Sequence, residues 1–161
     1  KPDSKRELTR KLFTYNCVNA VVCYVGHLKG YAWLSDAALD ESIANLALQA
    51  GLESSMALVA AFGFDAEEQR DWCHRALAKY QDETIRDPIE RNARDPVRKL
   101  GANERLLGPV NLCIEHDLPH DSLLIGIAAA LRYPDAPSGM LSDLTQANTA
   151  LDSLLARESI S

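Results

Sequence analysis

The chain has 161 residues, of which 47% are apolar and 25% are charged, and these values are typical of one compact globular domain. Its formal net charge of −6 argues against a general nucleic-acid-binding protein, because neutralising phosphates requires a net basic surface. Residues 1–11 are polar and charged, so they do not form a signal peptide. We therefore expect a cytoplasmic protein whose partners include neither nucleic acid nor a membrane.

Helical periodicity recurs along nearly the whole chain, while alternating strand patterns are scarce. A first long helix is expected at residues 3–27, ending in the region Gly26–Gly30. A second is expected to begin after Ser35 as its N-cap and to run to Phe62, where Gly63 breaks it. Asp65 then caps a helix that runs to about residue 80.

The second half of the chain continues the helical pattern. A short helix is expected at residues 88–93, and Asn103 is expected to cap a helix that ends near residue 116. Pro119, His120 and Asp121 open a helix that ends near residue 133, and a last helix follows from Ser142 to residue 157. The predicted fold class is therefore all-α, a multi-helix bundle with short connections.

Residues 12–28 contain no acidic side chain, lysine or arginine, so a membrane-spanning helix must be considered. The stretch is slightly short for a bilayer and contains Thr14, Asn16, Asn19 and His27, which favours a buried core helix instead. The four cysteines form no C-x-x-C pair and lie in apolar stretches, so we interpret them as reduced core residues rather than metal ligands. They are Cys17, Cys23, Cys73 and Cys113.

The first helix carries three polar residues within an otherwise apolar surface. At about 100° per residue, Asn19 lies about 80° and Asn16 about 140° from Lys11 on a helical wheel. A helix that is apolar all round belongs in the interior of a domain, so these three groups would face a shared buried space. Burial disfavours the charged form of an amine, which is the property that a general base needs. Alternatively, Lys11 lies at an exposed helix end and both asparagines satisfy backbone groups.

Residues 11–26 read KLFTYNCVNAVVCYVG. They resemble the K-x-x-x-x-N-x-x-H-x-x-x-x-Y-x-G motif of the polyol-specific long-chain dehydrogenases, the mannitol dehydrogenase family, and the K-L-F-T-x-N opening is similar to the mannitol-1-phosphate 5-dehydrogenase branch. In that family the lysine is the general base and the asparagine and histidine bind the reacting oxygen. The resemblance implies that Lys11 is the base and that Asn16 binds the oxygen. Asn19 replaces the histidine and cannot titrate, which indicates lower activity or a different substrate.

Residues 86–105 carry six basic and four acidic side chains. Such a segment is either a solvated face of arginine–carboxylate pairs or an anion pocket, because arginine binds phosphate with two parallel hydrogen bonds. Residues 94–109 are similar to the R-x-P-x-R-K-L…D-R-L-x-x-P stretch of the mannitol-1-phosphate branch, and residues 120–133 to a further helix of the family. The resemblance implies that Arg94, Arg98 and Lys99 bind substrate, with Arg98 and Lys99 favoured for a phosphate.

The resemblance covers residues 5–144 and implies a helical C-terminal domain of the kind found in the 6-phosphogluconate dehydrogenase-like superfamily. Such a domain binds a sugar alcohol or sugar phosphate and is joined to its own N-terminal nucleotide-binding domain, which holds NAD; the family uses no metal. The 161 residues contain no G-x-G-x-x-G and no βαβ pattern, so we expect this domain alone to be inactive.

The implied function is NAD-dependent interconversion of mannitol 1-phosphate and fructose 6-phosphate. Two alternatives stay open: a dehydrogenase of non-phosphorylated polyols or hexonates, and a catalytically degenerate helical interaction module.

Overall fold

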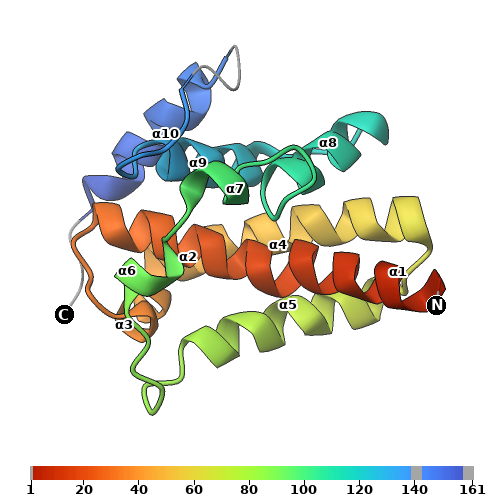
Figure 1. Ribbon diagram of the computed structural model, residues 1–161, viewed down its shortest axis with the longest axis horizontal. Helices are drawn as coiled ribbons and strands as arrows, with labels where there is room; N and C mark the ends of the chain where they lie inside the picture. Colours follow the sequence, from red (N-terminus) through yellow and green to blue (C-terminus); the bar gives the residue numbers. More distant parts are fainter. Residues whose placement is uncertain (1, 139–142, 158–161) are drawn as a thin grey trace.

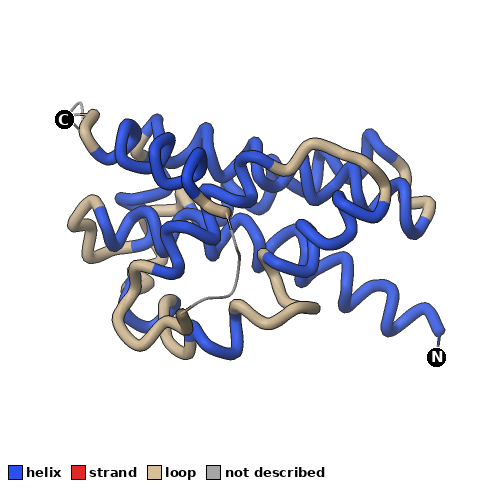
Figure 2. The backbone as a smooth tube through the Cα atoms, turned by 90° about the horizontal axis from the view of Figure 1, so that it is seen from above, coloured by secondary structure: helices blue, strands red, loops and turns tan. Residues whose placement is uncertain are grey.

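The computed structural model describes residues 2–138 and 143–157, and every regular element in these ranges is helical (Figure 2). The predicted all-α fold class is therefore confirmed. Figure 1 shows α1 and α2 as one long rod, with α4 and α5 alongside it and α8, α9 and α10 on the opposite side from α5. The elements are α1 (Pro2–Lys11), the π-helical turn η1 (Leu12–Asn16), α2 (Cys17–Leu28), α3 (Leu34–Leu39), α4 (Glu41–Phe62), α5 (Ala66–Tyr80), α6 (Ile89–Asn92), α7 (Pro96–Lys99), α8 (Leu107–Glu115), α9 (Asp121–Leu131) and α10 (Thr145–Leu155).

The predicted first helix is confirmed as a continuous helical rod from Pro2 to Leu28, followed by Gly30 at a φ of 86°. Its middle is not a regular α-helix, however, because η1 is a π-helical turn. Near the end of the rod, Gly26 allows close packing, since a Cβ there would lie 2.6 Å from that of Ala37. The preceding Tyr24 is buried and its hydroxyl donates to the Ala93 carbonyl at 3.0 Å. These two residues therefore hold α3 and the loop after α6 against the rod.

The predicted second helix is wrong in one respect, because it is two helices. The chain turns at Asp40, whose ψ of 120° ends α3, and Trp33 rather than Ser35 occupies the N-cap position of α3. The Asp40 carboxylate accepts hydrogen bonds from the backbone N–H groups of Ser42 and Ile43 and so caps α4. The cap at Asp40 therefore starts a new helix, although the apolar helical pattern continues through it.

The predicted boundaries around α5 are confirmed, with Gly63 at a φ of 73° and the Asp65 carboxylate accepting from the Glu68 N–H at 3.0 Å. The expected cap at Asn103 is wrong. Tight turns continue through this region, and the Glu104 N–H donates to the Gly101 carbonyl at 3.1 Å. As a result, α8 begins only at Leu107. The short helix α7 was not predicted as a separate element.

The start of α9 was predicted correctly, but its cap comes from another helix. The Glu53 carboxylate of α4 accepts from the N–H groups of Ser122 at 3.2 Å and Leu123 at 2.9 Å. His120 has a structural role there, with Nδ1 within 2.9 Å of the Leu118 carbonyl. For α10, the expected start at Ser142 lies outside the described residues.

All four cysteines are buried and unpaired, which agrees with their interpretation as core residues. Burial raises the pKa of the Cys23 thiol to about 12 and that of Cys113 to about 11. Among the described helices, α4 is long and apolar enough to cross a membrane, but half of its apolar stretch is buried against other helices. The contacts of α4 are therefore those of a core helix.

Asp40 forms a nearly buried ion pair with Lys29. Its carboxylate accepts from Lys29 Nζ at 2.8 Å and from the Tyr31 hydroxyl at 2.7 Å, and both charged side chains are nearly buried. Burial by itself raises the pKa of Asp40, but the hydrogen bonds from Lys29, Tyr31, Ser42 and Ile43 outweigh it and hold the pKa well below the ordinary value.

We expect Asp40→Asn to lower the free energy of unfolding by about 3 kcal/mol at pH 7, because Lys29 would lose its buried partner. A depressed pKa stabilises the fold above the ordinary aspartate value, and this contribution is lost as the pH falls through the folded value. The difference between the variant and the wild type should therefore shrink in acid. Urea unfolding at several pH values measures it. Asp95→Asn, at an exposed ion pair, is the control and should have little effect.

Candidate functional site

Asn19 is the single residue between Cys17 and Gly26 that is not buried. The other residues from Cys17 to Gly26 are buried in the core, so along this part of α2 only the side chain of Asn19 reaches the surface. It lines a cavity of about 230 Å³ together with Tyr80, Asp87 and Asn92. A polar group held at the floor of a cavity by a rigid helix is a suitable group to orient a ligand.

Asn92, at the end of α6, joins Asn19 to the basic segment. Asn19 Nδ2 donates to Asn92 Oδ1 at 3.2 Å, and Asn92 Nδ2 donates to the Pro88 carbonyl at 2.9 Å. The Asn92 backbone carbonyl accepts from Lys99 Nζ at 2.6 Å. Two of the predicted site residues, Asn19 and Lys99, are therefore held by one intervening residue that the sequence analysis missed.

Lys99 is buried, with only 9% of its surface exposed. Burial lowers the pKa of its ammonium group, and the nearby positive charge of Arg105 lowers it further. Arg105 is itself mostly buried and pairs with Glu104 at 3.2 Å. Lys99 Nζ thus bonds to a backbone carbonyl rather than to a carboxylate, and a second cation lies close enough to lower its pKa, an arrangement that favours an anionic ligand. Arg105 was not among the predicted substrate-binding residues, although it lies in the same arginine-rich segment.

Arg94 and Arg98 do not line the Asn19 cavity, and their role in substrate binding stays a prediction. Arg98 is exposed and pairs with Asp95 at 2.8 Å and with Glu104 at 3.9 Å, so carboxylates already use its guanidinium group. Arg94 lines a separate, open groove that also contains Glu90, Asp95 and Asp135. Of the three, Lys99 is the one that bonds to Asn92, the residue that contacts Asn19.

Lys11 is exposed, so the expectation that its amine is buried is wrong for this domain. It lies in an open groove of about 740 Å³ between α1 and α5, lined also by Leu8, Tyr15, Trp72 and Lys79. In the part of the chain that the structure describes, the side chains of Lys11 and Asn16 make no hydrogen bond or ion pair. Asn16 is half-buried.

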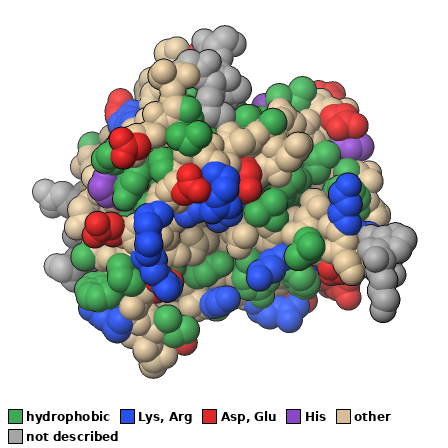
Figure 3. Space-filling view, in the orientation of Figure 1, with side chains coloured by type: hydrophobic (Ala, Val, Ile, Leu, Met, Phe, Trp, Pro, Cys, Tyr) green, Lys and Arg blue, Asp and Glu red, His purple; other side chains and the backbone are tan. Residues whose placement is uncertain are grey.

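The Lys11 groove and the Asn19 cavity adjoin each other, because Lys79 lines both. Tyr15 and Tyr80 lie between them, and the Tyr80 hydroxyl donates to the Tyr15 carbonyl at 2.9 Å. Figure 3 shows that lysine and arginine side chains gather over this face of the molecule, which α1, α2, α5 and α7 form in Figure 1. We call the Lys11 groove and the Asn19 cavity together the α2–α5 face.

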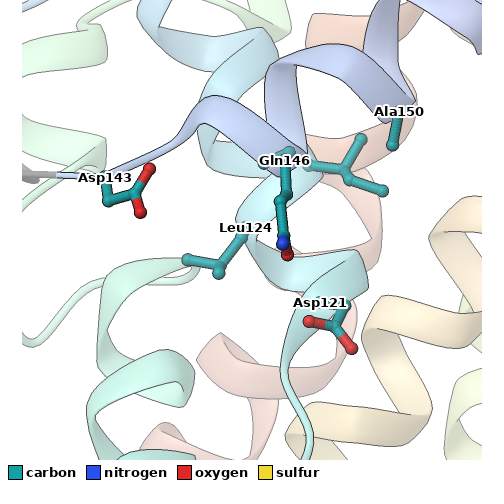
Figure 4. A pocket seen from close by; sticks show the side chains of 7 residues that line it. Asp121, Leu124, Asp143, Gln146 and Ala150 are labelled. Carbon is teal, nitrogen blue, oxygen red and sulfur yellow. The ribbon is translucent and has the colours of Figure 1, made fainter.

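A second cavity, of about 280 Å³, lies between α9 and α10 (Figure 4). Its polar lining consists of Asp121, Asp143 and Gln146, and the remaining lining residues are apolar. It contains none of the predicted catalytic or basic residues.

The described residues contain no group of three or more His, Cys, Asp or Glu side chains that could hold a metal ion. They also contain no strand that leads through a glycine-rich turn into a helix, which is the element that holds dinucleotide phosphates.

The sequence profile of the mannitol dehydrogenase C-terminal domain matches residues 7–153. The crystal structure of a D-sorbitol dehydrogenase in substrate-free form is similar, with 20% identity, a TM-score of 0.62, and coverage of 76% of this chain and 25% of that one. The Pseudomonas fluorescens mannitol 2-dehydrogenase in a ternary complex with NAD and D-mannitol has 16% identity, a TM-score of 0.58, and coverage of 92% and 30%. This chain thus spans less than a third of the length of either protein.

If Lys99 and Arg105 form the anion site, inorganic phosphate should stabilise the chain against heat. At ten times its dissociation constant, a bound ligand adds about 1.4 kcal/mol to the free energy of unfolding. Arg105→Gln should remove most of this gain, while Arg98→Gln, at an exposed carboxylate-paired arginine, should retain it. Thermal unfolding in phosphate, compared with sodium chloride at equal ionic strength, measures the effect. An equal loss in both variants would contradict the assignment.

Proposed function

The chain belongs to the mannitol dehydrogenase family, as its C-terminal domain, and on this premise we propose that it binds and positions the substrate of an NAD-dependent dehydrogenase that interconverts mannitol 1-phosphate and fructose 6-phosphate. The observation that carries the proposal is the α2–α5 face. There Lys11 and Asn19 line adjoining hollows, and Asn92 bonds both to Asn19 and to the buried Lys99.

In the proposed reaction, Lys11 takes the proton from the hydroxyl group that is oxidised. Asn16 and Asn19 donate hydrogen bonds to the reacting oxygen and so orient it, which is the role of fixed dipoles that stabilise developing charge. Asn92 fixes the direction of the Asn19 amide, because its Oδ1 accepts one Asn19 proton. NAD, when bound, supplies the acceptor for the hydride.

We propose that NAD is held mainly by an N-terminal nucleotide-binding domain, which packs over the Lys11 groove. Leu8 in this groove is 68% exposed, and Tyr15 and Trp72 add apolar surface beside it. An exposed apolar groove of this kind is a typical site for another domain or protein. Covering it would remove Lys11 from water and so provide the burial that a lysine base requires.

The phosphate specificity is supported by two cations: Lys99 is buried and bonds to the Asn92 carbonyl, and Arg105 is mostly buried and close enough to lower the pKa of Lys99. A polyol without a phosphate gives these charges no partner, so it should bind less well. In the polypeptide that joins this domain to its nucleotide-binding domain, we expect kcat/KM for mannitol 1-phosphate to exceed that for mannitol by at least about a hundredfold. NADH formation with each substrate measures this ratio, and a preference for free mannitol or sorbitol would instead favour a non-phosphorylated polyol.

Asn19 occupies the position of the family's histidine, and we expect Asn19→His to raise the turnover of the intact enzyme. Histidine can donate a hydrogen bond to the reacting oxygen and also exchange a proton, whereas asparagine can only donate. A polar stabiliser of this kind commonly contributes on the order of 10²-fold in rate. Unchanged or lower turnover would count against a catalytic role of this position and would fit a chain that has lost the activity.

A further inference from the structure

The three proposed catalytic residues, Lys11, Asn16 and Asn19, follow one another along the rod of α1, η1 and α2. The π-helical turn η1 separates Lys11 from Asn19 and ends at Asn16. In a regular α-helix, residues five apart point about 140° away from each other. A π turn closes with hydrogen bonds between residues five apart, so Asn16 comes slightly more than one turn after Lys11 and points about 50° away from it rather than about 140°. Asn19, three α-helical residues further on, then turns back by about 60° toward the direction of Lys11.

The π turn is held by side chains from two other helices. Ser54 of α4, which is fully buried, donates from its hydroxyl to the Phe13 carbonyl. Tyr80 of α5 donates from its hydroxyl to the Tyr15 carbonyl at 2.9 Å. Both carbonyls belong to η1, so these two bonds are made to the part of the backbone that departs from α-helical geometry.

A third bond holds the side chain between these two carbonyls. Gln69, also fully buried, donates from Nε2 to the Thr14 hydroxyl at 3.1 Å. The direction of the Gln69 amide is fixed, because its Oε1 accepts from Arg10 Nε and its Nε2 also donates to the Ser55 hydroxyl at 3.1 Å. Arg10 Nη2 has no hydrogen-bond partner, but the buried amide and hydroxyl groups are paired, and another arrangement of the chain would leave some of them unpaired.

We propose that Ser54, Gln69 and Tyr80 are positioning residues, which hold η1 in its π-helical form and thereby align the Lys11 amine with the Asn16 and Asn19 amides. This inference rests on the proposed function, because it assigns a role to the alignment of the proposed base. None of the three needs to touch the substrate for this role. A shift of about 1 Å in a reacting group can lower a rate on the order of a hundredfold.

Tyr80 is the most informative of the three residues to change. It is half-buried, its hydroxyl bonds to η1, and its side chain lines the cavity that contains Asn19. Burial raises the pKa of Tyr80, and the neighbouring Tyr15 raises it further, so the hydroxyl keeps the proton that it donates. Tyr80→Phe removes this donor, together with the interaction of the hydroxyl with the Asn19 side chain, and leaves the ring in place.

The test is a double-mutant cycle in the polypeptide that joins this domain to its nucleotide-binding domain. Tyr80→Phe is expected to lower kcat by about tenfold to a hundredfold while KM for the sugar phosphate changes by less than about threefold. In a Lys11→Ala background, the same change should lower the residual kcat by less than about twofold, because there is no base left to misalign.

Tyr31→Phe is the matched control, since it also removes one hydroxyl hydrogen bond, to Asp40, away from the α2–α5 face. It should lower the thermal midpoint about as much as Tyr80→Phe while leaving kcat within about twofold of the wild type. Ser54→Ala is the second variant, and it should reproduce the loss in kcat through the Phe13 carbonyl. This keeps the inference testable if Tyr80→Phe does not fold.

The outcomes separate the two proposals. If Lys11→Ala abolishes activity but Tyr80→Phe and Ser54→Ala keep the wild-type kcat, the positioning role is wrong and the proposed function stands. If Tyr80→Phe lowers kcat equally in both backgrounds, it acts independently of Lys11, and the inference is likewise overturned. If Lys11→Ala retains the wild-type kcat, the proposed function itself is wrong.

Discussion

The structure depends on the burial of one helix, α2, by the helices around it. From Cys17 to Gly26 the α2 segment contacts other helices on every side, and Asn19 alone is not buried. A helix packed in this way cannot rotate or slide without opening the core. Every polar group along the rod therefore has a fixed direction, and the α2–α5 face inherits its geometry from the packing of α2 rather than from a loop.

Much of this fold could be predicted from the sequence, because its determinants are local. The apolar run of the first helix, the glycine at Gly63 and the cap at Asp65 each act within a few residues. The errors arise where distant groups decide. Asp40 divides the second helix with help from Lys29, and Asn103 leaves its helix uncapped because the chain continues in turns. Neither effect is visible in a periodic pattern.

The site was predicted only in part, for a similar reason. The family is confirmed by the match over residues 7–153, while the catalytic roles on the first helix stay predictions. A uniform helical wheel could not reveal the π turn, since η1 is held by Ser54 and Tyr80 from helices far along the chain. Within the arginine-rich segment, composition could not separate Lys99, which is buried, from Arg98, which is exposed. That difference depends on how the short helix α7 packs.

The carboxylate of Glu53 begins α9 from the middle of α4, and burial raises the pKa of this group although the two N–H bonds oppose the rise. A helix whose first turn is completed by a different helix cannot fray from its N-terminus while that partner is folded. We therefore expect α9 to unfold together with α4. The amide protons of Ser122 and Leu123 should then exchange with solvent when α4 opens, so their exchange rate measures the stability of α4.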